Sequence, residues 1–216
     1  MPIQRAKPRF SEIKNTDNVI GSSQLDLTAN YAFTGTVTGM GTDLILDESF
    51  GSFAGAGSVA AYDISSTYIN STYDTYFLEG TFRPSSDNKY VQMQTFVGGV
   101  VQTGDVYASE GQYAPGGHSS NNNTGSSLFI QQFGSGGDAG EGTTLQMTIQ
   151  NVNSTDVPFT ISGFCSHINT DPNQGGTLFT GQMIHANRAD VVNGIRFKMH
   201  SGNIHGGHVR LYGYKT

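Results

Sequence analysis

Three histidines near the C-terminus, His200, His205 and His208, have the residue type and spacing that most suggest metal chemistry. Neutral imidazole is a common ligand of zinc and related metals. Residues 195–199 alternate apolar and polar side chains, which predicts a strand ending at His200. A glycine-rich turn leads to a second strand at His208, so the two strands are predicted to form a C-terminal hairpin across which His200 and His208 could face each other. The segment has no carboxylate to complete a ligand shell, so we predict no metal centre within one chain. Copies of one histidine converging on a trimer axis remain an alternative.

Sequence motifs of catalysis are missing from the chain, which has no nucleophile elbow, zinc-protease helix, P-loop or dinucleotide fingerprint. Asp47 and Glu48 are adjacent acids, but neighbouring residues of a strand point to opposite faces. Asp138 and Glu141 lie in a glycine-rich segment, where they could bind calcium weakly or simply hydrate a loop. We therefore predict a protein that is not an enzyme and needs no cofactor.

Cys165 is the only cysteine, so the chain cannot form an internal disulfide. This is typical of a protein made and assembled in a reducing cytoplasm. Residues 159–165 form an apolar, strand-like run, and the sequence predicts a buried small side chain there rather than a catalytic thiol.

The elements that must carry these residues are strands. Charged residues make up only 13% of the chain, while 29 glycines, 13 phenylalanines and 10 tyrosines indicate many short strands around a packed interior. Period-2 alternation over 75–82, 91–97 and 145–150, with turn signals between the runs, predicts an all-β, jelly-roll-like antiparallel β-sandwich over residues 46–216. A barrel is the alternative. No fixed-period repeat indicates a propeller or a β-helix.

Residues 1–45 are expected to form an extended N-terminal arm. Residues 1–14 carry a net charge of +3 and the rest of the chain −9. The acidic body argues against nucleic-acid binding, because phosphate contacts need clustered Lys and Arg. Arg5, Lys7 and Arg9, with Phe10, are expected to dock on an acidic protein surface, or else to be solvated.

Within this arm, residues 25–37 show the clearest alternation in the protein. The apolar side chains on odd positions include Leu25, Leu27, Tyr31, Phe33 and Val37. Thirteen extended residues would span roughly 43 Å. Burying these side chains does not offset the entropy of ordering so long a free strand. The strand must therefore join a sheet, of the same chain or of a neighbouring subunit.

Residues 111–127 are predicted to be a long loop at one end of the sandwich. The candidate contact residues within it are Tyr113, His118, Asn121, Asn122 and Asn123. A loop of this length is usually functional or mobile, and a flexible exposed loop is the alternative. The ten tyrosines suit either sugar and protein recognition or the half-buried face of a sheet.

No apolar run approaches the ~20 residues that a membrane-spanning helix needs, and the N-terminus lacks the apolar region of a signal peptide. We therefore expect a soluble protein without a membrane partner.

The C-terminal segment resembles the ending of many structural proteins of tailed bacteriophages. The resemblance lies in an Ile195-Arg196-Phe197 strand, a Ser201-Gly202-Asn203-Ile204 turn and a terminal Leu211-Tyr212-Gly213. Residues 25–37 are similar to a connector that precedes the body in phage fibre and decoration proteins. The resemblance implies a trimeric β-sandwich outside a virion, with its N-terminal arm anchored to capsid or tail. The chain lacks the long stalk of such fibres, which favours a capsid decoration protein or a short tail-attached fibre.

The expected function is thus structural, on the exterior of a phage particle assembled in the host cytoplasm. Its expected partners are the major capsid protein or tail proteins and further copies of the chain as a homotrimer. The alternative is an adhesion module that recognises a host surface glycan, and a lectin outside any virion is a third possibility.

Overall fold

The computed structural model describes residues 42–52, 57–114, 117–131, 133–168, 175–184, 187 and 189–214. The predicted arm residues Arg5, Lys7, Arg9, Phe10, Leu25, Leu27, Tyr31, Phe33 and Val37 lie outside these ranges. Within the ranges no helix is long and apolar enough to cross a membrane. Residues Met40–Thr216 form one compact unit.

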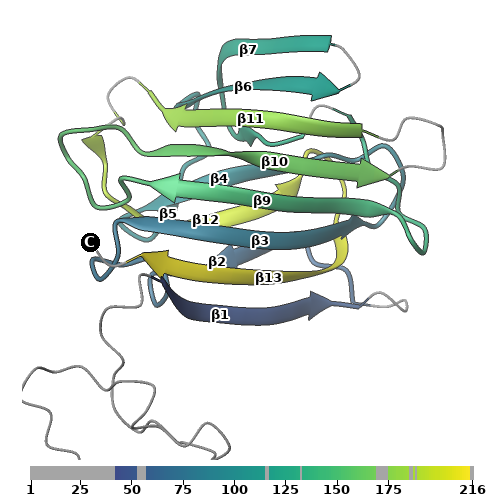
Figure 1. Cartoon of the computed structure of the whole chain (residues 1–216), viewed down its shortest axis with the longest axis horizontal. Coiled ribbons are helices and arrows are strands. Elements are labelled where there is room, and N and C mark those ends of the chain that lie inside the picture. The colour runs from purple at the N-terminus through teal and green to yellow at the C-terminus, as the bar shows by residue number, and fades with distance from the viewer. Residues whose placement is uncertain are drawn as a thin grey trace, which may run out of the picture. The chain divides into compact units, whose positions relative to one another are not determined.

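The described chain is all-β, with two antiparallel sheets packed face to face (Figure 1). The predicted β-sandwich is therefore confirmed. The larger sheet has eight strands, which in spatial order are β1 (Thr42–Gly51), β13 (Ile204–Tyr214), β3 (Thr75–Pro84), β9 (Gly142–Gln150), β10 (Thr160–Ile168), β11 (Gly175–Met183), β6 (Tyr107–Ala114) and β7 (Gly117–Gly125). The smaller sheet has five, in the order β2 (Ala61–Ile64), β12 (Val192–Met199), β4 (Val91–Val97) and β5 (Val100–Val101), with β8 (Leu128–Phe129) paired to β4.

The chain crosses repeatedly between the two sheets, and the core lies between them. Strands β3, β4 and β9 occupy the runs where period-2 alternation predicted strands. Their inward side chains are buried, as the alternation requires, and rings meet across the interface, with Phe82 and Phe197 at 5.0 Å between centroids. Strand β1 begins at Thr42, so residues 42–45, assigned to the arm from the sequence, belong to the body.

The predicted C-terminal hairpin is wrong. Strand β12 lies between β2 and β4 in the smaller sheet, whereas β13 lies between β1 and β3 in the larger one. Ile195 and Phe197 face the core from one side, and Val209 and Leu211 face it from the other. Alternation shows that each strand has one apolar face, but the apolar faces of two strands can lie side by side in one sheet or opposite each other across the core. Here they lie opposite, because the link 200–203 crosses from one sheet to the other.

The glycines of β13 allow aromatic rings to pack directly on its backbone. A Cβ atom at Gly207 would lie 2.4 Å from Phe50 Cζ and 2.4 Å from the backbone oxygen of Thr81. Phe50 in turn stacks on Tyr62 of the smaller sheet, with ring centroids 3.9 Å apart. The glycine-rich C-terminal motif is therefore part of the core packing.

The predicted contact loop at residues 111–127 is a β-hairpin instead. Strands β6 and β7 pair antiparallel at one edge of the larger sheet, with Gln112 opposite His118 and Ser109 opposite Asn121. Tyr113, Asn122 and Asn123 also lie on these strands. Ser, Asn and Gly have low strand propensity, but backbone pairing with β6 outweighs it at a sheet edge. For residues 113, 114 and 117–124 the structure describes only the backbone.

Candidate functional site

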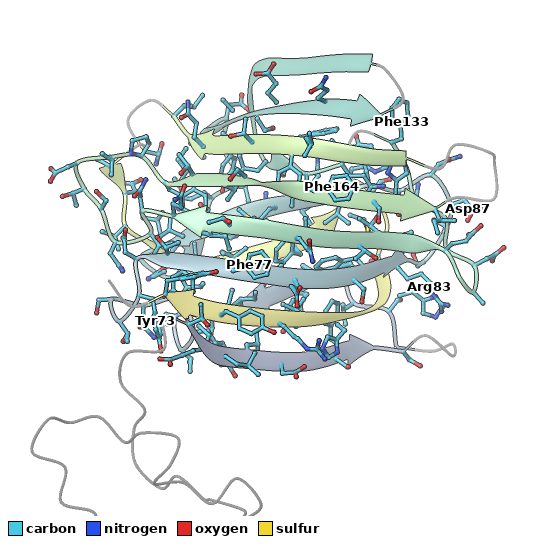
Figure 2. All side chains as sticks on the ribbon, viewed as in Figure 1. Tyr73, Phe77, Arg83, Asp87, Phe133 and Phe164 are labelled. Atoms are coloured by element: carbon cyan, nitrogen blue, oxygen red, sulfur yellow. The ribbon has the colours of Figure 1, made fainter. Side chains whose placement is uncertain are left out.

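The outer face of the larger sheet carries the most developed surface feature of the described chain. Cross-strand pairing sets its side chains in rows perpendicular to the strands. One row contains Tyr212, Phe77, Thr148, Ser162, Thr180 and Glu110. The next contains Arg210, Glu79, Gln146, Phe164, Leu178 and Gln112. These residues come from six strands, and only the sheet register brings them together. Two of them, Phe77 and Phe164, are labelled in Figure 2.

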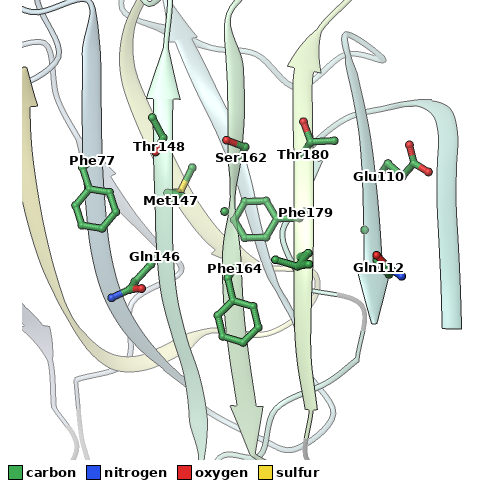
Figure 3. Close-up of a pocket in the computed structure, with 13 residues that line it drawn as sticks. Phe77, Glu110, Gln112, Gln146, Met147, Thr148, Ser162, Phe164, Phe179 and Thr180 are labelled. Carbon is green, nitrogen blue, oxygen red and sulfur yellow. The ribbon is translucent and has the colours of Figure 1, made fainter. Parts of the chain in front are cut away.

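A hollow of about 630 Å³ lies over β9, β10, β11 and β6 on this face. We call it the outer-face groove, and its outward-pointing lining includes Phe77, Gln146, Ser162, Phe164, Leu178 and Glu110 (Figure 3). Its volume lies within the range of about 300–1,000 Å³ typical of ligand sites. Unlike an enclosed pocket, it is open to solvent.

Large apolar side chains stand exposed in the groove. Phe164 on β10 is 44% exposed, and its cross-strand neighbour Leu178 on β11 is 57% exposed. On the far side of β9, Phe77 lies beside Tyr212, with ring centroids 6.2 Å apart. A cluster of exposed apolar side chains with polar surroundings typically marks a binding surface.

The position of Phe164 depends on a glycine in the adjacent strand. A Cβ atom at Gly176 would lie 2.5 Å from Phe164 Cε2 and 2.6 Å from its Cζ, so the ring lies over the bare backbone of β11. Because Gly176 has no side chain, it leaves the space that the Phe164 ring occupies on the face.

Polar side chains separate the apolar ones. Gln146 donates from Nε2 to Glu79 Oε1 at 3.2 Å, which orients its amide between Phe77 and Phe164. Among the described residues that line the groove, Glu110 is the only charged one. The groove thus combines aromatic faces, amides and hydroxyls with little charge.

Two smaller hollows adjoin the groove on the same face. One of about 210 Å³ shares Thr180 and Glu110 with it and continues to Thr160 and Gln182. The other, of about 550 Å³, includes Ser166, the next outward residue after Phe164 on β10. The three hollows follow one another along β10, and we call them together the trough.

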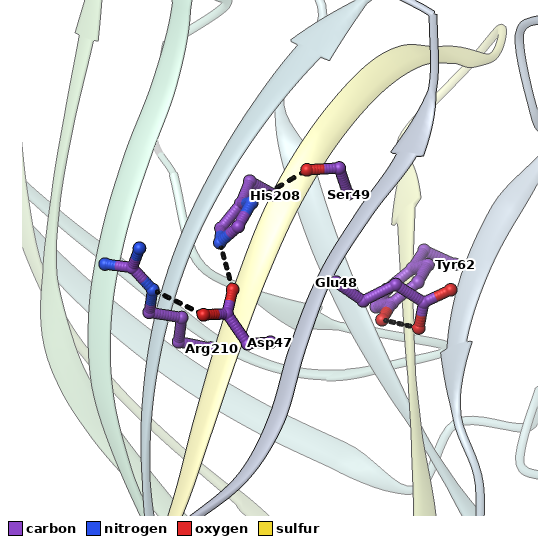
Figure 4. Close-up of polar contacts among 6 residues, drawn as sticks. All are labelled: Asp47, Glu48, Ser49, Tyr62, His208 and Arg210. Atoms are coloured by element: carbon purple, nitrogen blue, oxygen red, sulfur yellow. Dashed lines mark hydrogen bonds and ion pairs between the residues drawn. The ribbon is translucent and has the colours of Figure 1, made fainter.

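A second polar constellation lies at the β1–β13 end of the face (Figure 4). Ser49 Oγ lies 2.9 Å from His208 Nδ1. His208 Nε2 lies 2.7 Å from Asp47 Oδ1, but the geometry of this contact is not that of a hydrogen bond. Arg210 Nε lies 3.4 Å from Asp47 Oδ2. The residue types are those of a hydrolase triad. The grouping could not be predicted from the sequence because Ser49 and His208 are 159 positions apart.

This constellation lacks the rest of a hydrolytic site. None of the three hollows is lined by Ser49, Asp47 or His208. Acyl transfer also needs preorganised donors for the oxyanion, whereas the β1 backbone facing β13 is committed to sheet pairing. Exposed polar pairs of this kind contribute roughly 0–1 kcal/mol to stability. We interpret the group as a polar contact that ties β1 to β13.

Asp47 and Glu48 do point to opposite faces, as the strand periodicity predicted. Asp47 lies with His208 on the outer face, whereas Glu48 accepts a hydrogen bond from the Tyr62 hydroxyl at 3.0 Å. Burial, and then this hydrogen bond, raises the pKa of the Tyr62 phenol.

The three C-terminal histidines do not converge. His200 directly follows β12 and stacks on Tyr90, which directly precedes β4, with ring centroids 3.7 Å apart. His208 lies on β13 in the larger sheet. Facing of His200 and His208 across a hairpin is therefore excluded. Desolvation and the nearby Lys89 and Lys198 lower the pKa of His200. No three His, Cys, Asp or Glu side chains gather in the described ranges as metal ligands would.

Cys165 is a buried core residue, as predicted. Its side chain is fully buried on β10, and the thiol donates to the backbone oxygen of Ile130 at 3.4 Å. Burial raises the pKa of the thiol to about 11. A thiol so protected has neither the access nor the thiolate fraction of a nucleophile.

Comparison of the chain with protein-family models, with curated proteins and with solved structures finds no match.

Proposed function

We propose that this protein is a non-enzymatic structural component on the exterior of a tailed-phage particle. It would serve as a capsid decoration protein or a short tail-attached fibre, in contact with the major capsid protein or with tail proteins. The observation that carries the proposal is the place of the phage-like C-terminal segment in the fold. Strands β12 and β13, which contain it, lie inside each of the two sheets and supply core residues to both. The segment that carries the resemblance therefore also supplies side chains to the core of the body.

A second observation supports separate roles for the N-terminal arm and for the body. Met40–Thr216 is compact by itself, so folding of the body need not require the preceding residues. The basic residues Arg5, Lys7 and Arg9 would then engage acidic patches on the particle, and residues 25–37 would add a strand to a sheet there. Self-association as a homotrimer is part of the proposal.

The test is co-sedimentation of purified protein with particles that lack it. The full chain should bind, whereas a chain without residues 1–40 should keep its cooperative thermal unfolding but stay in the supernatant. A triple charge reversal at Arg5, Lys7 and Arg9 should weaken binding and make it less salt-dependent. The control is a double reversal on the body, Lys89→Glu with Lys198→Glu. Particle binding by the truncated chain would refute the role of the arm.

A second candidate function is adhesion to a host surface glycan. The specific observation in its favour is the outer-face groove, with the exposed Phe164 and the half-buried Phe77 among amides and hydroxyls. This moves the candidate contact surface from residues 111–127 to the face of the larger sheet. The two functions are compatible, since a protein anchored by its N-terminus can present this face to a cell.

A further inference from the structure

We propose that the trough on the larger sheet binds a linear, uncharged oligosaccharide whose chain runs parallel to strands β9, β10 and β11. The inference rests on the second candidate function, glycan recognition, and specifies its ligand class, its direction and the residues that hold it. Four observations carry it: the shape of the trough, its aromatic side chains, its polar side chains and its charge.

The trough extends along β10. Its outward residues on β10 run from Thr160 to Ser166, and all three hollows touch this line. Six residues of extended chain span roughly 20 Å. A trough of this length suits a chain of several rings better than a single small molecule.

The aromatic side chains match the faces of sugar rings. A pyranose ring presents C–H groups on its faces and hydroxyls around its rim, so it can lie against an aromatic side chain while its rim bonds to polar neighbours. Phe164, whose ring lies over Gly176, offers such a surface in the middle of the trough, and the half-buried Phe77 offers another across β9. Leu178 extends the apolar patch on the other side of Phe164.

The polar side chains are those that bond hydroxyl groups. Amides donate and accept, and hydroxyls do the same, so both can satisfy the mixed pattern of a sugar rim. They are spaced along the full length of the trough on neighbouring strands, and they include Gln112, Gln146, Thr148, Ser162, Thr180 and Gln182.

The charge of the trough selects against acidic glycans. Glu110 lies in both the groove and the smaller hollow, and Glu141 lies in the third. Among the described residues that line the trough, the single basic one is Arg83, which is only 8% exposed. A uronate or sialate chain would therefore meet the carboxylates of Glu110 and Glu141 within the trough, and like charges at such a surface cost binding energy.

A second copy of the chain is the main rival for this face. The core of a protein interface is depleted in charged residues and dry, whereas here amides and hydroxyls surround two or three apolar side chains. A symmetric dimer would also bring the same patch of both copies together, placing Glu110 of each copy in one interface. The composition of the trough therefore favours a sugar over self-association.

The test titrates the full chain with neutral hexose oligosaccharides of graded length and with uronic-acid oligosaccharides of equal length, by calorimetry. Neutral chains should bind and affinity should rise with length until the trough is filled. Phe164→Ala should weaken binding at least tenfold, the effect of losing a central aromatic anchor. Gly176→Ala, which displaces the Phe164 ring, should weaken it in the same direction. Phe133→Ala, at an aromatic residue 40% exposed outside the trough, is the matched control and should leave binding unchanged.

Glu110→Gln gives an independent check on charge, since it should retain the neutral chains and gain affinity for the acidic ones. Preference of the unmodified protein for uronates, or binding that survives Phe164→Ala, would overturn this inference while leaving glycan recognition standing. Absence of any glycan binding, together with an oligomer that dissociates on Phe164→Ala, would overturn both and assign the face to contacts between copies.

Discussion

A tyrosine hydroxyl buried between the two sheets gives a demanding test of the packing described above. Tyr107 lies on β6 and is 1% exposed. Its hydroxyl accepts a hydrogen bond from Thr95 N at 2.8 Å and donates one to the backbone oxygen of Gln102 at 3.0 Å. Thr95 belongs to β4 in the other sheet, so one oxygen atom joins the two layers. Tyr107→Phe removes that atom and keeps the ring.

The expected cost follows from what the change leaves behind. Thr95 is fully buried, and its N–H would lose its partner in a place that water does not reach. An unsatisfied buried donor costs about 1–3 kcal/mol. Gln102 is partly exposed, so water can satisfy its carbonyl at smaller cost. We therefore expect Tyr107→Phe to lower the free energy of unfolding by about 1–3 kcal/mol, or roughly 2–4 °C in Tm per kcal/mol for a chain of this size.

The assay is urea denaturation followed by circular dichroism, with scanning calorimetry in parallel. The matched control is Tyr212→Phe, since Tyr212 is half-buried on the outer face beside Phe77 and should lose less than about 0.5 kcal/mol. Equal stability of Tyr107→Phe and the unmodified protein would show that the hydroxyl does not bridge the sheets as described. A similar loss in both variants would point to a general effect of removing a phenol.

Three further predictions test other parts of the account. The pKa of the Cys165 thiol is raised to about 11, so the thiol is almost wholly protonated near pH 8. A thiol reagent should therefore label the native protein at least a hundredfold more slowly than the urea-unfolded protein. Equal labelling rates would mean that Cys165 is accessible. The same shift contributes stability below the unfolded thiol pKa, and this is lost as pH rises toward 11. Gly207→Ala would place a methyl group 2.4 Å from the backbone oxygen of Thr81 and should cost about 1–3 kcal/mol by overpacking, measured as a shift of the urea midpoint; an unchanged midpoint would contradict the close approach. A fluorophosphonate probe should leave Ser49 unlabelled, by intact-mass spectrometry, and stoichiometric labelling would revive a hydrolytic role.

Several strands and the burial of Cys165 could be predicted from the sequence because both follow from one physical rule, the burial of apolar side chains. Alternation of Tyr76, Leu78 and Phe82 with polar residues predicts a strand with one buried face, and β3 has that form. A cysteine within an apolar run is expected to be buried, and Cys165 is. Such inferences need only the local period of the chain.

Pairing partners could not be predicted in the same way. The alternation in β12 and β13 is compatible both with a hairpin and with two strands facing each other across the core. Strand β7 has a composition typical of loops, and only its pairing with β6 makes it a strand. The groove was missed because Phe77, Gln146, Phe164 and Leu178 come from four strands, and their adjacency depends on registers that no local pattern specifies.

Protein composition of purified virus particles tests the central claim most directly. Tailed-phage particles propagated from the source of this sequence would be banded by density, stripped of loosely bound protein with salt and analysed by quantitative mass spectrometry. The account predicts that this chain remains with the particles, in a fixed ratio to the major capsid protein or to a tail protein. Recovery of the chain only in the particle-free fraction would contradict a structural role on the virion.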